Sequence, residues 1–108
     1  MTQPAFFASA LVGQDAFSSE RHKTRTVAAA VADEIRAMDR KATHVRADVS
    51  SRDDVYAAVD HTVEQLGGFD IMVNNAGIAQ VQPIAEITPE GIERILKINV
   101  AGVLWGIQ

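Results

Sequence analysis

The chain has no cysteine, and among its 108 residues it has a single tryptophan and a single tyrosine. Without cysteine there is no disulfide framework and no thiolate metal site, which fits a reducing compartment, so we expect a cytoplasmic location. Positive charge is not in excess either. The formal net charge is -4, and no basic face favours binding to nucleic acid.

Long apolar runs are also missing. The stretch from Ala5 to Val12 is too short to span a bilayer and no basic segment precedes it, so we expect neither a membrane helix nor a signal peptide. What is present is the composition of an ordinary globular domain, 47% hydrophobic and 22% charged. The length allows one domain at most, and it is short for a complete doubly wound fold with a catalytic half.

Helical and strand patterns alternate along the chain from Val27 onward. The spacing predicts an amphipathic helix with an apolar face, a strand within Lys41 to Asp48, a second helix, and a strand from Phe69 to Val73. The apolar face of the first helix comprises Val27, Ala28, Val31, Ile35 and Met38. This order predicts an α/β fold with a parallel sheet, since such connections are made by helical crossovers.

Short signals mark where the later helices begin and end. Ser50, three residues before Asp53, predicts a capping box at the start of the second helix, and Gly67-Gly68 predicts its end. Thr88-Pro89 predicts the start of a last helix, on which Asn99 falls on the apolar face. That face comprises Ile92, Ile95, Leu96, Asn99, Gly102, Val103 and Gly106.

The first 26 residues fit this pattern less well. Ala8 to Val12 is compatible with a first strand, but residues 14–26 are too few for another helix, another strand and two turns. We therefore expect one strand-helix layer to be absent or replaced. We divide the chain into a divergent segment, residues 1–26, and a partial dinucleotide-binding domain, residues 27–108.

The junction Asn74-Asn75-Ala76-Gly77 follows the apolar run Ile71-Met72-Val73. In open parallel sheets ligands bind outside the carboxyl ends of the strands, and small residues let the backbone approach a flat ligand. The junction is thus either the floor of a cofactor site or a strand end with an Asx turn. Its position after an apparently buried strand favours the cofactor site.

Asp48-Val49 ends the preceding predicted strand and should reach the same edge of the sheet. The aspartate can accept a hydrogen bond from an adenine amino group while the valine packs on the ring, or it can help to cap the next helix, and the spacing favours neither role. Asn99 can bond a carbonyl in an irregular helix or hold a water molecule of a proton relay, and the structural role is favoured. The three histidines show no spacing typical of a metal site.

Several of these motifs, in their order and intervals, resemble the short-chain dehydrogenase/reductase family. They are Asp48-Val49, Gly67-Gly68-Phe69-Asp70, Asn74-Asn75-Ala76-Gly77 and Asn99-Val100. The resemblance implies a Rossmann-type, three-layer α/β/α fold with a doubly wound parallel sheet that binds NAD or NADP and moves a hydride to or from a small carbonyl or alcohol.

By the same resemblance, Asp48 and Val49 would contact adenine, and Asn74, Ala76 and Gly77 would line the ribose and nicotinamide. Asn99 would be the catalytic amide that holds a relay water. The last helix, Pro89 to Gln108, would pair subunits into a homo-oligomer. Within the family, residues 77–108 look most like the acetoin (diacetyl) reductase and 2,3-butanediol dehydrogenase branch.

Two features depart from the family. Its glycine-rich turn, which holds the pyrophosphate, would fall where Gln14-Asp15-Ala16-Phe17 stands, and Asp15 would repel phosphate. The family's serine and Tyr-x-x-x-Lys pair have no counterpart, since the one tyrosine, Tyr56, lies on the second predicted helix. We therefore expect an oxidoreductase by family whose chain alone is inactive. The alternatives are a non-catalytic module that binds a nucleotide or pairs with another subunit, and a gene remnant.

Overall fold

The computed structural model describes the backbone of residues 9–11 and 21–108 and the side chains of residues 27–108. Its elements, in chain order, are strand β1 (Ser9–Leu11), helix α1 (Arg21–Ala37), strand β2 (Thr43–Val45), helix α2 (Arg52–Leu66), the 3-10 turn η1 (Ile84–Glu86), helix α3 (Pro89–Leu96), the π-helical turn η2 (Lys97–Ala101) and helix α4 (Gly102–Ile107). The predicted alternation is confirmed as far as α2, and α1 begins earlier than Val27. The glycine-rich turn's expected place, Gln14 to Phe17, lies outside the described residues.

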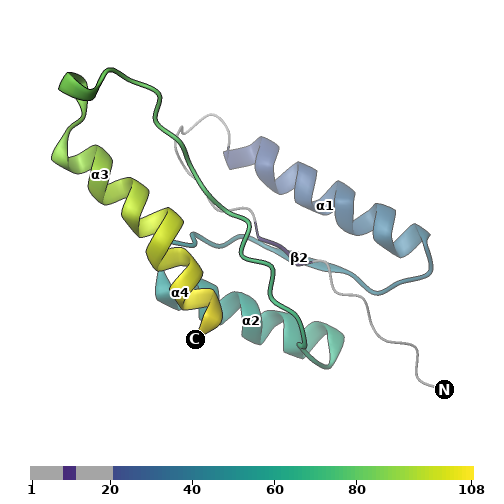
Figure 1. Cartoon of the computed structure of the whole chain (residues 1–108). Coiled ribbons are helices and arrows are strands. Elements are labelled where there is room, and N and C mark those ends of the chain that lie inside the picture. The colour runs from purple at the N-terminus through teal and green to yellow at the C-terminus, as the bar shows by residue number, and fades with distance from the viewer. Residues whose placement is uncertain (1–8, 12–20) are drawn as a thin grey trace.

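The two strands are parallel and adjacent, with Ser9 opposite Thr43 and Leu11 opposite Val45. Helix α1 connects them, and the strands lie between α1 and α2 (Figure 1). The predicted first strand is therefore confirmed as β1, and a single helix separates it from its parallel neighbour. These elements form an α/β unit.

Alanines make the contact surface of α1. Ala28 and Ala32, one turn apart, are buried, whereas Val27, Val31 and Met38 are exposed. The predicted apolar face was therefore wrong in part, because the small alanine side chains, and not the larger valines, face the rest of the molecule.

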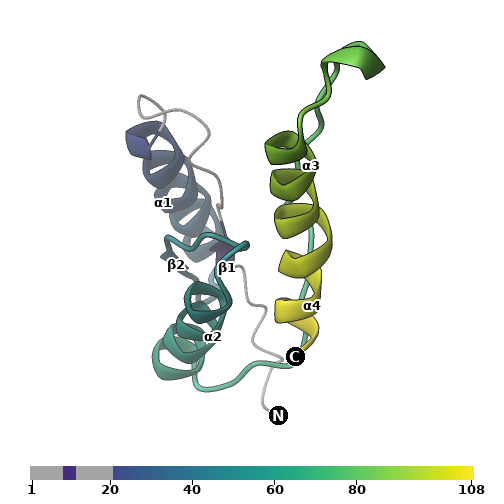
Figure 2. The ribbon, with the colours of Figure 1, turned by 90° about the vertical axis from the view of Figure 1, so that its left-hand side faces the viewer.

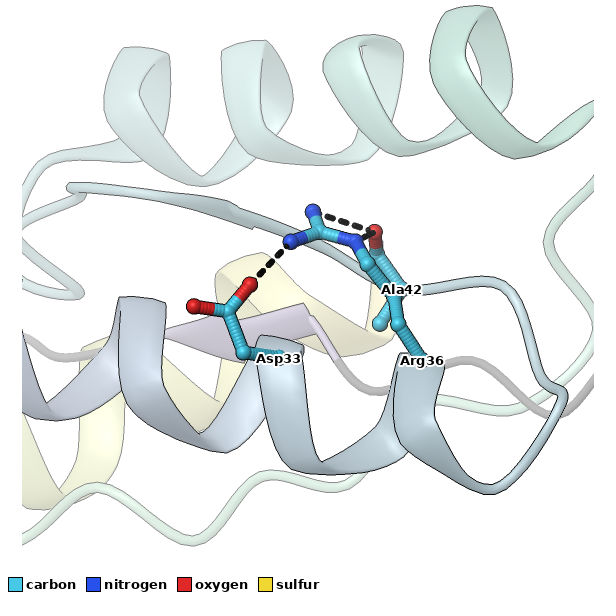
Figure 3. Close-up of polar contacts among 3 residues, drawn as sticks. All are labelled: Asp33, Arg36 and Ala42. Carbon is cyan, nitrogen blue, oxygen red and sulfur yellow. Dashed lines mark hydrogen bonds and ion pairs between the residues drawn. The ribbon is translucent and has the colours of Figure 1, made fainter.

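Arg36 ties the end of α1 to the chain entering β2 (Figure 3). Its Nε and Nη2 donate to the Ala42 carbonyl oxygen at 3.1 and 2.8 Å, and its Nη1 contacts Asp33 Oδ1 at 2.7 Å. The bidentate geometry of the guanidinium suits this fork, so one side chain fixes the helix and the following segment together.

Helix α2 begins one residue later than the sequence predicts. The cap is Ser51, whose Oγ accepts from Asp54 N at 3.3 Å, so the Ser50 and Asp53 capping box was wrong. The reason is that Ser50 is already engaged: its N–H and its hydroxyl both donate to Asp48 Oδ1. The predicted end is confirmed, since Gly67 closes the helix at a φ of 88°, a left-handed conformation that glycine adopts without strain.

The predicted strand from Phe69 to Val73 was wrong. Residues 68–83 form no strand, and Ile71 and Val73 are each 76% exposed. Their neighbour Met72 packs against the core, so the side chains still alternate as in extended backbone. Among the described residues no strand pairs with this segment, and without hydrogen bonds to a neighbouring strand its backbone remains irregular.

The last helix begins as predicted. The Thr88 side chain accepts from Gly91 N at 3.1 Å and Pro89 takes the first position. Helices α3 and α4 continue through the π turn η2, so the chain is helical from Pro89 to Ile107. A π turn contains one extra residue, which rotates the helix face after the turn relative to the face before it. Ile92 and Leu96 precede the turn; they were expected on the same buried face as Asn99 but are about half-exposed.

Candidate functional site

The helical segment that contains Asn99 gathers the predicted site residues along one side. A Cβ added to Gly102 would lie 3.1 Å from the Val49 carbonyl oxygen, and one added to Gly106 would lie 2.9 Å from Asn74 Cγ. One turn earlier, Asn99 contacts Gly77 and Ile78. Figure 2 shows the segment after α2 running alongside α3 and α4. The helix therefore brings Val49, Asn74, Gly77 and Asn99 to one face.

Asn99 binds the backbone of Ile78 with both ends of its amide. Its Oδ1 accepts from Ile78 N and its Nδ2 donates to Ile78 O, both at 2.8 Å. Asn99 lies within the π turn η2, the kind of local irregularity found at many functional sites. The structure thus confirms the structural role that the sequence favoured, a bond to a carbonyl from an irregular helix, and this pair fixes the chain just after Gly77.

Asp48 lies exposed at the turn between β2 and α2. Its Oδ1 accepts from the N–H and the hydroxyl of Ser50 at 2.9 and 2.7 Å, and its own N–H donates to Asp54 Oδ2 at 2.9 Å. Asp48 therefore shapes the turn before α2, whereas the cap of the helix itself is Ser51. Among the described residues Oδ2 of Asp48 makes no hydrogen bond, so this oxygen is available as an acceptor.

Val49 and Ala76 contribute to packing beneath this face. Val49 is 7% exposed and forms a core cluster with Val55 and Ile98, against which Ala76 and Trp105 pack. Val49 can therefore meet a ligand only with a small part of its surface.

Asn74 and Gly77 are exposed, and no backbone hydrogen bond engages residues 68–77 among the described part of the chain. Asn74 offers an amide donor and an acceptor, while Gly77 has no side chain to separate a ligand from the backbone. We use the name polar rim for Asp48, Asn74 and Gly77, three exposed residues on segments that approach the last helix at Val49, Asn74 and Gly77. Such a rim can hydrogen-bond the hydroxyls and amino groups of a flat polar ligand.

A separate hollow of about 260 Å³ lies beside this rim, between α3 and the turn before α2. It is lined by Ser50, Glu90, Glu93, Arg94, Lys97 and Ile98. Lys97 Nζ lies 2.7 Å from Glu93 Oε1, and this hydrogen-bonded charge pair lowers the pKa of the Glu93 carboxyl. Both side chains are well exposed, so the pair is a weak surface interaction.

Sequence reasoning missed a link between α2 and the end of α4. Arg52 Nε donates to Gln108 Oε1 at 2.9 Å, and the Tyr56 hydroxyl donates to the same oxygen at 2.9 Å. The Arg52 guanidinium also lies 4.4 Å from the centre of the Tyr56 ring. The four-residue spacing of Arg52 and Tyr56 could have indicated their contact on a helix, but nothing in the sequence pointed to Gln108.

Neither a metal-ion cluster nor a membrane-spanning helix is present among the described residues. No cluster of three or more histidine, aspartate or glutamate side chains is placed to hold a metal ion in the part of the chain with described side chains. Across the same residues, each helix is too short or too polar to cross a bilayer.

Comparison with known proteins places the chain among dehydrogenases. Residues 6–108 match the family model described as short chain dehydrogenase. The chain is 47% identical over 74 residues to an L-2,3-butanediol dehydrogenase from Corynebacterium glutamicum, covering 68% of this chain and 29% of that protein. It is 56% identical over 62 residues to a diacetyl reductase [(S)-acetoin forming] from Staphylococcus aureus, covering 57% of this chain and 24% of that protein.

Similarity to solved structures supports the same family. A blue fluorescent protein from a metagenomic library, in complex with NADPH, matches with a TM-score of 0.73 at 37% identity, over 80% of this chain and 35% of that one. A short chain dehydrogenase from Burkholderia cenocepacia, in complex with NADP, matches with a TM-score of 0.72 at 33% identity, over 85% of this chain and 36% of that one. The chain thus spans about a quarter to a third of the proteins that it matches.

Proposed function

The chain belongs to the short-chain dehydrogenase family, and on that premise we propose that it is the dinucleotide-binding part of an NAD(P)-dependent oxidoreductase acting on a small carbonyl or alcohol. The supporting observation is that Asn99, Gly102 and Gly106 of the last helix lie against Ile78, Val49 and Asn74, the segments that carry the polar rim. The similarity to a diacetyl reductase and an L-2,3-butanediol dehydrogenase suggests diacetyl or acetoin as the substrate.

The residues of the rim fit a dinucleotide. Asp48 Oδ2 can accept from the adenine amino group, while Asn74 can bond a ribose hydroxyl and Gly77 leaves room for a flat ring above the backbone. We assign Ala76 and the small exposed part of Val49 to the apolar floor beside them. The cofactor, when bound, would supply or accept the hydride.

Asn99 would act in this site by holding the backbone. Its bidentate bond fixes Ile78, and with it the chain at Gly77, at the edge where the nicotinamide end would lie. Because both ends of the amide are occupied, a relay water would have to be held by other atoms near Asn99. We therefore assign Asn99 a positioning role within the proposed site.

This chain on its own should not turn over a carbonyl substrate. Tyr56, its one tyrosine, bonds Arg52 and Gln108 on the side of α2 and α4, so it is not placed as a proton donor to the rim. Without a donor and a cation to lower the pKa of that donor, general acid catalysis is lost, which removes a factor of about 10² to 10⁴ in rate.

A second candidate is a non-catalytic module that pairs with another subunit, with a gene remnant as the remaining alternative. An apolar stripe on the last helix favours pairing: Ile92, Leu96, Val100 and Leu104 recur every four residues and each is about half-exposed. We propose that this helix, Pro89 to Gln108, is where a homo-oligomer would form.

Titration with NADH and with NADPH tests the proposal. Trp105, the only tryptophan, packs against the same core cluster as Ala76, so energy transfer from its indole to a bound nicotinamide should report binding. We expect saturation below millimolar cofactor, weakened by Asp48→Asn but unchanged by Asp60→Asn, an exposed carboxylate on α2. No saturation with either cofactor would refute both the dehydrogenase and the nucleotide-binding proposals.

Addition of diacetyl to the chain saturated with reduced cofactor separates binding from turnover. The nicotinamide absorbance should stay constant for this chain alone. A measurable decay would show that a proton donor other than a Tyr-x-x-x-Lys pair serves the site, and it would contradict the proposed inactivity.

A further inference from the structure

The Asp48 side chain is exposed, yet the chain holds this residue at two points. Ser50 donates to Asp48 Oδ1 twice, with its backbone N–H at 2.9 Å and with its hydroxyl at 2.7 Å. Asp54 Oδ2 accepts from the Asp48 N–H at 2.9 Å. One carboxylate oxygen of Asp48 is therefore engaged by two donors, and the backbone beneath it is fixed as well.

The Ser50 hydroxyl serves neither the cap of α2 nor the backbone turn before it. Ser51 provides the cap, since its Oγ accepts from Asp54 N at 3.3 Å. The turn is closed by the Ser51 N–H, which donates to the Asp48 carbonyl oxygen at 2.9 Å. The bond from the Ser50 hydroxyl thus acts on the Asp48 side chain alone.

Two donors that converge on one carboxylate oxygen also decide where the other oxygen points. An exposed aspartate otherwise exchanges among several side-chain orientations, and each ligand that it binds must pay for ordering it. With Oδ1 held by Ser50, Oδ2 keeps one direction before a ligand arrives. The arrangement therefore has the form of an oriented hydrogen-bond acceptor.

We infer that Ser50 is a positioning residue of the proposed cofactor site, whose hydroxyl holds Asp48 Oδ1 so that Oδ2 is oriented to accept from the amino group of adenine. This inference rests on the proposed function, in which Asp48 meets the adenine end of the cofactor. It adds that Ser50 helps the rim to select a purine with an exocyclic amino group. An oxo group in that place offers no proton to Oδ2.

The reduced hypoxanthine analogue of NADH tests this selection. The analogue differs from NADH only in its purine, where an oxo group replaces the amino group, so energy transfer from Trp105 to the nicotinamide reports both ligands alike. The ratio of the two dissociation constants isolates the bond to the amino group. We expect the unmodified chain to bind NADH about tenfold more tightly, as for one hydrogen bond to a charged group.

Ser50→Ala and Ser51→Ala make the same chemical change at neighbouring positions. Without its hydroxyl, Ser50 no longer fixes Oδ1, and the cost of ordering Asp48 should reduce the ratio by about two- to tenfold. Ser51→Ala should lower the urea midpoint through loss of the cap and leave the ratio unchanged. Ser50→Thr keeps the hydroxyl, and because Ser50 lines the hollow beside α3 its added methyl has room, so this variant should restore the ratio.

The outcomes separate this inference from the proposed function. If the unmodified chain binds neither NADH nor NADPH, the proposed function fails and the role of Ser50 fails with it. If NADH binds but Ser50→Ala keeps the full ratio, the site stands and only the role of Ser50 is refuted. An equal fall of the ratio in Ser51→Ala would also refute it, because that variant leaves both bonds to Asp48 Oδ1 in place.

NMR on the chain without cofactor measures the orientation of Asp48 directly. Three-bond couplings to the carboxyl carbon of Asp48 should show one rotamer in the unmodified chain and in Ser51→Ala, and an average of several in Ser50→Ala. A single rotamer in Ser50→Ala would overturn the inference, since the hydroxyl would then not be what holds the side chain.

Discussion

The region up to the end of α2 and the region after it differ in how much of their apolar side-chain surface is buried. In the first region α1, β2 and α2 pack together and Ala28, Ala32 and Ala58 are buried, although Val27 and Met38 stay exposed. In the second, Ile71, Val73 and the apolar stripe of the last helix stay exposed. An amphipathic pattern thus forms a core only where a covering element lies next to it.

The two regions meet in a small cluster. Val49 and Val55 come from the first region and Ile98 from the second, and the Asn99 pair with Ile78 lies one residue further along the helix. This cluster is one of the places where the two regions meet, beside the contacts of Gly102 with Val49 and of Gln108 with Arg52 and Tyr56. Four substitutions test contacts at this cluster and along the last helix.

Truncation of Ile98 should lower the free energy of unfolding more than the other substitutions. Ile98→Ala removes most of a side chain that is 7% exposed, and loss of burial together with the cavity should cost about 2 to 4 kcal/mol. Urea unfolding measures the loss. Leu104→Ala, the matched change at a half-exposed position, should cost far less, and an equal loss for the two variants would show that the cluster does not hold the regions together.

A larger residue at Gly102 should cause the second-largest loss of stability. A Cβ there would lie 3.1 Å from the Val49 carbonyl oxygen and from Val49 Cγ2, and backbone cannot move aside as a side chain can. We expect Gly102→Val to cost about 1 to 3 kcal/mol by overpacking. Leu104→Val introduces the same residue on the exposed side of α4. If both variants unfold alike in urea, the close approach of α4 to Val49 is not what limits this position.

Removal of the Asn99 amide should have a smaller and more local effect. Asn99→Ala loses two hydrogen bonds to Ile78, which should cost about 1 to 2 kcal/mol in total. Hydrogen exchange at the Ile78 amide should accelerate, whereas Asn75→Ala, an exposed amide nearby, should leave that rate unchanged. Unaltered exchange at Ile78 in Asn99→Ala would rule out the positioning role.

The smallest effect concerns the exposed pair of Glu93 and Lys97. The hydrogen bond and charge of Lys97 lower the pKa of Glu93 from its ordinary value of 4.5, so the pair stabilises the folded chain above that value. This contribution is lost as the pH falls through the lowered pKa. In an NMR titration Lys97→Met should raise the pKa of Glu93 toward 4.5, and an unchanged pKa would mean that the pair does not form in solution.

Much of the first region follows from the sequence, because its signals are local. The end of α2 at Gly67 depends on a few adjacent residues and was predicted correctly, as was the start of the last helix at Thr88-Pro89, a local signal within the second region. The cap of α2 was misplaced by one residue because Asp48 engages Ser50, an interaction that competes with the pattern of Ser50 and Asp53.

The second region was harder to predict, because its structure depends on neighbours distant in sequence. The run Ile71-Met72-Val73 has the composition of a buried strand, yet a strand also needs a partner, and composition does not show whether one is adjacent. The order of the site residues along the chain was visible in the sequence. Their gathering on one helix was not, because it depends on contacts such as Gly106 with Asn74.

The sequence by itself determined the alternation of helices and strands as far as α2, the end of α2, the start of the last helix and the family, since each is encoded by spacing and by short motifs. Only the tertiary structure decided which apolar faces are covered, that Asn99 bonds Ile78 through both ends of its amide, and that Asp48 shapes a turn while keeping one oxygen open. The physical reason is that burial and hydrogen bonding depend on what lies beside a residue in space, and that is fixed only when the whole chain packs.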